Sequence, residues 1–179
     1  MNIYVVRHCK AEGQSPSANL TEEGYLQAER VAEFLHGKPI EHIISSPFLR
    51  AIQSISPFAE KIQVNCHLDD RLSERVLCGE NNVNWLEMLR HTFTDLEICY
   101  EGGESSTSAM NRALAVITDV RNSGFSNVVI VTHGNLMSLL LKHYDTKFGF
   151  EEWASLSNPD VYHLQFEGEV PIIQRIWNG

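Results

Sequence analysis

Short apolar runs alternate along the chain with longer amphipathic stretches. Runs rich in Val and Ile predict strands at residues 2–6, 42–45 and 127–132, and a weaker run predicts a third strand in chain order at 63–67. The run at 127–132 contains four consecutive apolar residues, which is typical of a central parallel strand buried on both faces. Strands that alternate with helices favour an α/β layered fold.

Two of the amphipathic stretches have clear helical spacing and clear ends. Residues 19–36 predict a helix that Thr21 caps and Gly37 ends, and residues 105–122 predict a second helix that ends at Gly124. The first helix is expected to bury one face, made of Tyr25, Ala28, Val31, Ala32 and Leu35.

The remaining elements have weaker signals. Ser46-Pro47 predicts the start of a helix, with Ser46 as the cap and Pro47 in the first position, and Pro57 is expected to kink or end that helix. Residues 68–103 have weak periodicity and are expected to include a short helix. Residues 135–144 predict a helix, and 161–166 with 170–176 predict a terminal hairpin.

Length and composition suit one globular domain spanning residues 1–179. The chain has a mass of 20.3 kDa, 43% hydrophobic residues and 21% charged residues, so disorder is not expected. Its net charge of −9 disfavours nucleic-acid partners, because an acidic surface repels phosphates over long range. The sequence carries no signal for an oligomeric state.

The sequence also bears on location. No apolar run reaches the roughly 20 residues that span a bilayer, and the N-terminus lacks the pattern of a secretory signal, so no membrane partner is expected. The four cysteines form no CxxC pair and are too sparse for a disulfide scaffold. We therefore expect reduced thiols and a cytoplasmic protein.

The candidate chemistry lies where two predicted strands end. Arg7-His8 follows the first strand, His133-Gly134 follows the strand at 127–132, and Arg50 lies just after the strand at 42–45. Ligands of open α/β sheets bind at the carboxyl ends of the strands, so these side chains converge if the strands are neighbours. Arginine donors match phosphate oxygens, and nearby positive charge keeps a histidine nitrogen unprotonated and able to attack. The pattern indicates phosphoryl transfer.

The order of several short motifs resembles the histidine phosphatase superfamily, the phosphoglycerate-mutase-like proteins. The motifs are Arg7-His8 and residues 20–24 (LTEEG), 27–28 (QA), 45–51 (SSPFLRA), 72–74 (LSE), 103–105 (GES) and 131–134 (VTHG). The resemblance covers residues 2 to about 140. It implies a three-layer α/β fold with a mixed, mostly parallel sheet and helices on both faces.

The resemblance also implies roles for individual residues. His8 is the expected nucleophile, and Arg7, Arg50 and His133 are expected to hold the phosphoryl oxygens. Glu74 is the expected general acid for the leaving oxygen and then the base for water. The family implies no metal or organic cofactor.

Two positions in the first motif differ from most members of the family. Cys9 stands where most members have glycine, and we interpret it as a small packed residue, with a redox-sensitive thiol as the alternative. Gln14 lies near the position where many members place an asparagine that contacts phosphate, so it is a minor substrate-binding candidate.

The acid role has rivals. Glu74 lies between Arg71 and Arg75, so a surface salt bridge is the alternative interpretation of this residue. Glu80 and Glu104 are the other candidate acids, although Glu104 is more simply explained as support for the helix that begins near residue 105.

Other enzyme classes lack their motifs. A cysteine-dependent phosphatase needs Arg six positions after Cys, and no P-loop, dinucleotide-binding or HExxH motif is present. The residues found six positions after the cysteines are Ser15, Leu72, Asn84 and Ser105.

We therefore expect a metal-independent phosphomonoester hydrolase, a phosphatase of the histidine acid type, that acts through phosphohistidine on a small phosphorylated metabolite. The alternatives are phosphoglycerate mutase-type transfer, for which related enzymes are longer, and a catalytically silent phospho-ligand binder. Specificity is expected to come from residues 76–102 and 10–19.

Overall fold

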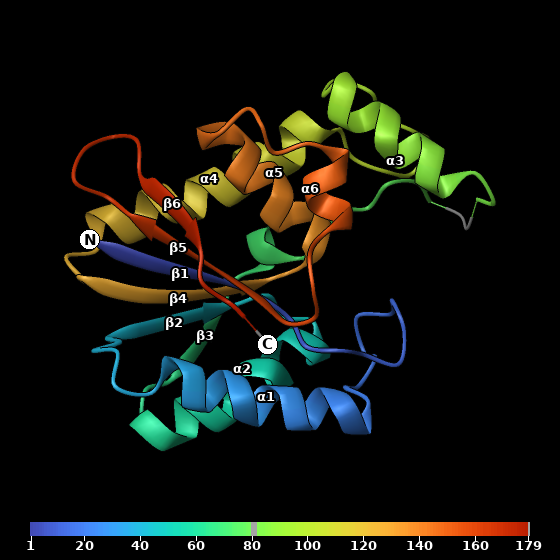
Figure 1. The fold of residues 1–179 in the computed structure, drawn as a ribbon. Helices are drawn as coiled ribbons and strands as arrows, with labels where there is room; N and C mark the ends of the chain where they lie inside the picture. Colours follow the sequence, from blue (N-terminus) through green and yellow to red (C-terminus); the bar gives the residue numbers. More distant parts are fainter. Residues whose placement is uncertain (80–81, 179) are drawn as a thin grey trace.

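A single six-stranded sheet forms the centre of the computed structural model, which describes residues 1–79 and 82–178 (Figure 1). The first four strands in chain order pair in parallel, the fifth runs antiparallel to both of its neighbours, and the sixth again points the same way as the first four. The mixed, mostly parallel sheet predicted from the sequence is therefore confirmed. Across the sheet the order is β3 (Cys66–Leu68), β2 (His42–Ser45), β4 (Asn127–Thr132), β1 (Asn2–Arg7), β5 (Asp160–Gln165) and β6 (Ile172–Arg175).

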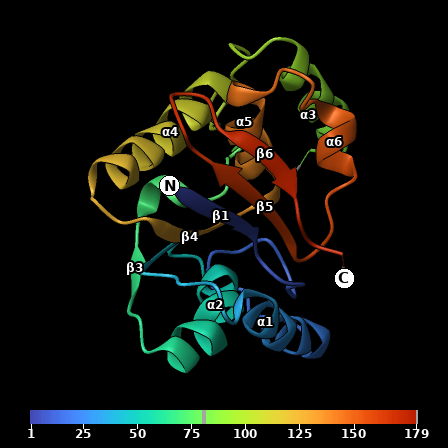
Figure 2. The ribbon, with the colours of Figure 1, turned by 60° about the vertical axis from the view of Figure 1, so that its left-hand side comes forward.

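Helices cover both faces of this sheet. α1 (Glu22–Leu35) and α2 (Leu49–Ile62) pack on one face, and α4 (Ser106–Asn122), α5 (Gly134–Tyr144) and the short α6 (Phe150–Ala154) lie on the other (Figures 1 and 2). Successive side chains of a strand point to opposite faces, so β1 contributes to both cores. Ile3 and Val5 join the cluster under α4 and α5, whereas Tyr4 and Val6 join the cluster under α1 and α2.

The two helices with strong sequence signals begin where they were predicted to begin. The Thr21 hydroxyl accepts a hydrogen bond from the Gly24 backbone N–H at 3.0 Å, and Ser105 caps α4 in the same way. The predicted burial of Tyr25 is wrong, because its side chain is 47% exposed. The buried stripe of α1 runs through Gly24 and Ala28 instead, which leaves Tyr25 beside the stripe and facing solvent.

The predictions for α2 need two corrections. The helix begins at Leu49 rather than at Pro47, and the Ser46 hydroxyl is not its cap. Pro57 lies inside the helix and does not end it, since the apolar face around Phe58 stays packed against α1 and the sheet. β3 is correspondingly later and shorter than predicted, because Gln63 adopts a left-handed conformation that ends α2.

The segment after β3 is mostly irregular, as its weak periodicity indicated. It contains the 3₁₀ turn η1 (Asp70–Leu72) and α3 (Trp85–Thr94). α3 projects beyond the sheet at the upper right of Figure 1, and it contacts α6 through edge-to-face ring pairs such as Trp85–Trp153. No helix among the described residues is long and apolar enough to cross a membrane.

Candidate active site

His8 stands at the carboxyl end of β1, beside the end of β4. Its backbone N–H donates to the Thr132 carbonyl at 3.0 Å, which joins the two strand ends as predicted. Its ring Nδ1 lies 2.7 Å from the Cys9 carbonyl. Because a carbonyl only accepts hydrogen bonds, Nδ1 carries the proton and Nε2 keeps its lone pair. Arg50 Nε donates to that Nε2 at 3.2 Å.

Arg50 reaches this point from the first turn of α2. Its side chain is 1% exposed, and its Nη1 donates to the backbone carbonyls of Gln14 and Ser15 at 3.2 and 2.9 Å. One guanidinium therefore connects the N-terminal loop to the His8 ring. Its five donors in a rigid plane make both connections possible, which a lysine could not match.

Arg7 supplies the second guanidinium from the last residue of β1. Its Nη1 donates to the Leu156 and Ser157 carbonyls at 3.0 and 3.2 Å, and its buried Nε has no hydrogen-bond partner in the protein. Gly134 allows this placement. A Cβ at position 134 would lie 3.0 Å from Arg7 Nε, so the guanidinium fits only because residue 134 lacks a side chain.

His133 follows β4 and is fully buried beside His8. The two ring centroids are 5.0 Å apart in an edge-to-face arrangement. His133 Nε2 lies 2.7 Å from the Ser46 hydroxyl, and its Nδ1 has no partner in the protein. We call the four side chains of Arg7, His8, Arg50 and His133 the phosphoryl pocket. The structure brings them together as the sequence predicted.

Burial and the two arginines keep both histidines neutral. Burial lowers the pKa of His8 to about 3, the hydrogen bond to the Cys9 carbonyl opposes that shift, and the positive charges of Arg50 and Arg7 reinforce it. The pKa of His133 lies well below its ordinary value, chiefly through burial, with His8 and the arginines as further causes. A neutral His8 ring with an unprotonated Nε2 is the form that can attack phosphorus.

Glu74 lies against the N-terminus of α5, next to the pocket. Its carboxylate accepts hydrogen bonds from the backbone N–H groups of Asn135 and Leu136 at 3.2 and 3.0 Å. Burial lowers the pKa of both Arg7 and Arg50, and the negative charge of Glu74 opposes that shift, which places it within electrostatic reach of both cations. The fold therefore anchors a carboxylate beside the cationic pocket.

The rival interpretations of the acidic residues are also tested by the geometry. The salt-bridge alternative for Glu74 is wrong: Arg71 pairs with Asp69 and Asp119, and Arg75 donates to Thr92 and a backbone carbonyl. The carboxylate of Glu104 forms a two-pronged pair with Arg112 on α4, which matches the support role predicted for it. Glu80 lies outside the described residues.

Two N-terminal candidates contribute little side-chain chemistry. Gln14 is exposed, and the group that it turns towards the pocket is its backbone carbonyl, which accepts from Arg50. Cys9 is fully buried, and burial raises the pKa of its thiol to about 11, although the Ser54 hydrogen bond opposes the shift. A thiol that stays protonated at neutral pH is a poor redox centre, so the packed-residue interpretation fits better.

Sequence reasoning missed two residues of the site. Ser46 was interpreted as a helix cap, yet its hydroxyl contacts His133. Asn158 gave no signal, because no motif surrounds it, and its side-chain amide donates to the His8 carbonyl at 2.7 Å. Asn158 therefore holds the backbone of the proposed nucleophile from the segment that leads into β5, the strand next to β1.

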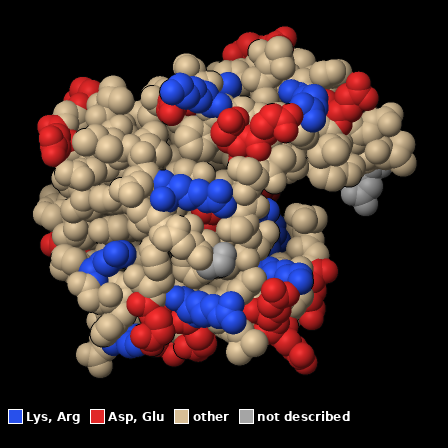
Figure 3. All heavy atoms as spheres, viewed as in Figure 1, with Lys and Arg blue, Asp and Glu red and all other residues tan. Residues whose placement is uncertain are grey.

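The molecular surface has a hollow at the end of the sheet where the phosphoryl pocket lies. Figure 3 shows a notch at the right of the molecule, between the projection formed by α3 and the N-terminal loop below it, with Lys or Arg atoms at its inner wall. Among the described residues, no group of three or more His, Cys, Asp or Glu side chains is placed to hold a metal ion. The positive charge beside the two pocket histidines comes from the guanidinium groups of Arg7 and Arg50.

Comparison with known families agrees with this geometry. Residues 3–179 match the family model described as histidine phosphatase superfamily (branch 1). The chain belongs to this superfamily. The match covers nearly the whole chain, including both strand ends that carry the pocket.

Some relatives are named as phosphatases and others as phosphoglycerate mutases. “Putative phosphoserine phosphatase 2” of Hydrogenobacter thermophilus is 24% identical over 184 residues, which cover 93% of this chain and 90% of the relative. “Probable phosphoglycerate mutase GpmB” of Proteus mirabilis is 30% identical over 160 residues, with coverage of 79% and 73%.

Solved structures share the fold. A phosphoserine phosphatase from Entamoeba histolytica, in complex with 3-phosphoglyceric acid, superimposes with a TM-score of 0.80 at 19% identity and covers 99% of this chain and 97% of its own. The predicted phosphoglycerate mutase-like architecture is thereby confirmed.

Proposed function

We propose that this protein is a phosphatase of the histidine acid type that hydrolyses a small phosphomonoester through a phosphohistidine at His8. The observation that carries the proposal is the convergence of two guanidinium groups, from β1 and α2, on a neutral histidine whose Nε2 carries no proton and faces Arg50. Membership in the histidine phosphatase superfamily supports the same chemistry. The cytoplasmic location stays a prediction from the sequence.

In the first step, His8 Nε2 forms a bond to phosphorus while the bond from phosphorus to the ester oxygen breaks. The oxygens of the transferring group carry negative charge throughout, so Arg7, Arg50 and His133 stabilise the transition state by donating hydrogen bonds. Glu74, in its protonated form, gives its proton to the leaving alkoxide, which departs as the alcohol. Gln14 stays a minor candidate for contact with the phosphoryl group.

In the second step, water attacks the phosphohistidine. Glu74, now a carboxylate, takes a proton from that water as the new bond to phosphorus forms and the bond to Nε2 breaks. Inorganic phosphate leaves, and the His8 ring returns to its neutral form. No metal ion is needed in this scheme, because the arginines supply the charge that a divalent cation supplies in other phosphatases.

The direct test is turnover of a panel of phosphomonoesters with and without a chelator. Phosphoserine and 3-phosphoglycerate belong in the panel because relatives and solved neighbours are named for them. We expect phosphate release that EDTA leaves unchanged. A strict requirement for an added divalent metal would contradict the proposal, and so would a lack of turnover across the panel.

The second candidate is phosphoglycerate mutase-type transfer, which the name of the Proteus mirabilis relative favours. The two activities separate when 3-phosphoglycerate is the only substrate. A phosphatase releases inorganic phosphate and glycerate, whereas a mutase accumulates the 2-phospho isomer. The partial exposure of Arg7 and His8 favours hydrolysis, because water can reach the nucleophile.

A further inference from the structure

The hydroxyl of Ser46 is held in one orientation by its surroundings. Ser46 is fully buried just after β2, and its backbone N–H donates to the Val131 carbonyl at 2.9 Å, which ties it to β4. Its Oγ accepts a hydrogen bond from the Phe48 backbone N–H at 3.2 Å and lies 2.7 Å from His133 Nε2. Ser46 is therefore the one residue in hydrogen-bond contact with the His133 ring in the described part of the chain.

The direction of the Ser46–His133 hydrogen bond follows from counting donors and acceptors. The Ser46 hydroxyl has one proton to donate, and His133 Nε2 is the only acceptor within its reach among the described residues. If Nε2 carried a proton instead, it would donate to the Ser46 oxygen, and the buried hydroxyl proton would be left without a partner, which is unfavourable. Ser46 therefore donates, and Nε2 accepts.

This direction determines which nitrogen of His133 carries the proton. A neutral imidazole has one N–H, so when Nε2 accepts, the proton is on Nδ1. Nδ1 is buried and has no partner in the protein, and the ring lies 5.0 Å from the His8 ring, beside Arg50. Oxygens of a phosphoryl group only accept hydrogen bonds, so an Nδ1–H attracts them, whereas an Nδ1 lone pair would repel them.

We propose that Ser46 is a positioning residue that holds His133 in the Nδ1–H tautomer and so makes that ring a hydrogen-bond donor to the transferring phosphoryl group. The role in catalysis rests on the proposed phosphatase function, but the tautomer itself does not. Ser46 does not itself take part in bond making or bond breaking. It acts on the reaction only through His133.

The first test needs no substrate, and it uses a variant only to assign the His133 signals. Long-range ¹H–¹⁵N correlation spectra of histidine-labelled protein distinguish the protonated from the unprotonated ring nitrogen of a neutral histidine. For His133, assigned by comparison with His133→Ala, we expect protonated Nδ1 and unprotonated Nε2 at neutral pH. A ring protonated at Nε2 would overturn the proposal.

The second test removes the Ser46 hydroxyl. In Ser46→Ala we expect His133 to lose its single tautomer and kcat/KM to fall about 10- to 100-fold, the range seen when an orienting partner of a functional histidine is removed. Ser46→Thr keeps a hydroxyl and should restore the Nδ1–H tautomer. The matched control is Ser138→Ala, because Ser138 is also fully buried and donates one side-chain hydrogen bond, to the Gly134 carbonyl.

A double-mutant comparison separates positioning from general damage. If Ser46 acts only through His133, then adding Ser46→Ala to His133→Ala should change kcat/KM by less than about 2-fold. A further loss as large as in the wild-type background would contradict the proposal. Failure of the phosphatase function would appear differently, as no turnover in the wild type with the His133 tautomer still as described.

Discussion

The phosphoryl pocket and the projecting segment of residues 76–103, described without residues 80 and 81, are built in opposite ways. The pocket side chains lie at the ends of central strands, where Arg50 and His133 are almost fully buried and bonded to several parts of the chain. The projecting segment exposes large apolar side chains instead, with Val83 95%, Trp85 48% and Leu86 47% exposed. It meets the rest of the fold through Leu89 and Phe93, which are buried in the core, through the Arg90–Glu151 ion pair and through ring contacts between α3 and α6.

We propose that this difference separates two functions within one fold. A pocket locked into the sheet suits chemistry, because electrostatic stabilisation requires groups that do not rearrange during the reaction. A projecting segment beside the notch suits recognition of whatever the phosphoryl group is attached to. Substitutions in the pocket should therefore reduce the rate for every substrate, and substitutions in the projecting segment should change the ranking of substrates.

The largest effect is expected from loss of the nucleophile. His8→Ala should reduce turnover of every phosphomonoester by about 10⁴-fold or more, because the proposed first step loses its nucleophile. Steady-state kinetics with an aryl phosphate measures this loss. His143→Ala, at the far end of α5, is the control and should retain wild-type turnover. Activity of His8→Ala near that of the control would contradict the assignment.

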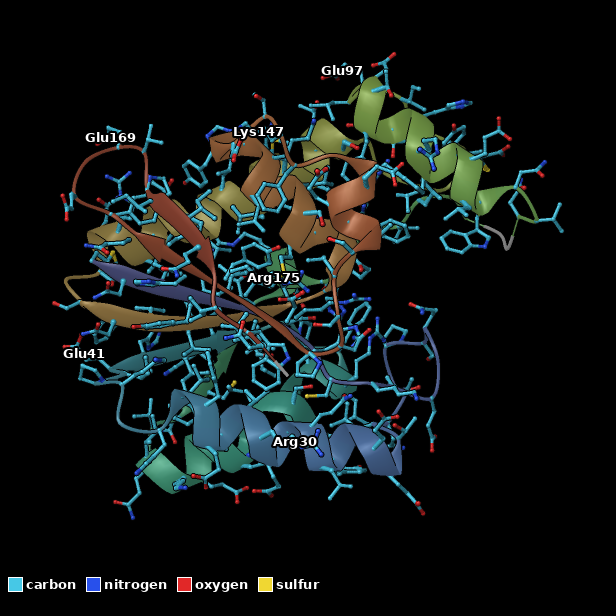
Figure 4. All side chains as sticks on the ribbon, viewed as in Figure 1. Arg30, Glu41, Glu97, Lys147, Glu169 and Arg175 are labelled. Carbon is cyan, nitrogen blue, oxygen red and sulfur yellow. The ribbon has the colours of Figure 1, made fainter. Side chains whose placement is uncertain are left out.

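Arg50→Lys should cost about 100- to 1000-fold in kcat/KM, although the charge is kept. A single ammonium cannot contact His8 and the two loop carbonyls in the geometry of the guanidinium. Circular dichroism should show that the variant is folded. Arg30→Lys on the exposed face of α1, labelled in Figure 4, is the matched control, and an equal loss there would remove the special role of Arg50.

Glu74→Gln should distinguish leaving groups. An alkyl phosphate should lose about 100-fold in kcat/KM and an aryl phosphate less than about 10-fold, because only the alkoxide needs a proton as it departs. Glu41→Gln is the control. Its carboxylate also accepts hydrogen bonds from backbone N–H groups, those of Ser126 and Asn127. It lies at the amino ends of the strands, away from the pocket (Figure 4). Equal losses for both esters would move the acid role to another residue.

The neutral His8 ring should make stability depend on pH. The pKa of His8 is lowered from its ordinary value of 6.5 to about 3, so the unfolded chain binds more protons between these values. The stability contribution is therefore complete above pH 6.5 and is lost as the pH falls towards 3. Replacing His8 with Gln should flatten the decline by about 1.4 kcal/mol per pH unit. Urea unfolding at pH 4–7 measures this slope, and identical slopes would contradict the burial-induced shift.

The smallest effect on chemistry is expected in the projecting segment. Trp85→Ala should leave kcat for a small aryl phosphate within about 3-fold of wild type, because Trp85 contacts the Trp153 ring and none of the pocket side chains. Its kcat/KM across a panel of larger esters should change in rank order. Uniform losses like those of Arg50→Lys would show that the segment supports the chemistry directly.

The sequence predicted the pocket because the reaction demands few residue types in fixed places. Arg7 ends one strand with a strong apolar signal, and His133 directly follows another. Because the carboxyl ends of parallel strands lie at the same edge of a sheet, the sequence predicted that these two residues lie close together. Ser46 was misinterpreted because Ser followed by Pro is also a typical helix start, and only the fold shows its hydroxyl against His133. Asn158 reaches His8 across 150 positions of sequence, which no local pattern could indicate.

The central claim is a covalent bond between phosphorus and the Nε2 of His8. It is tested most directly by mixing the protein with an aryl phosphate, quenching in denaturing base within milliseconds and mapping phosphoryl groups by peptide mass spectrometry. The account predicts one phosphoryl group on His8 that appears in the first turnover and disappears as substrate is exhausted. A phosphoryl group on another residue, or steady turnover with none on His8 at any time point, would contradict it.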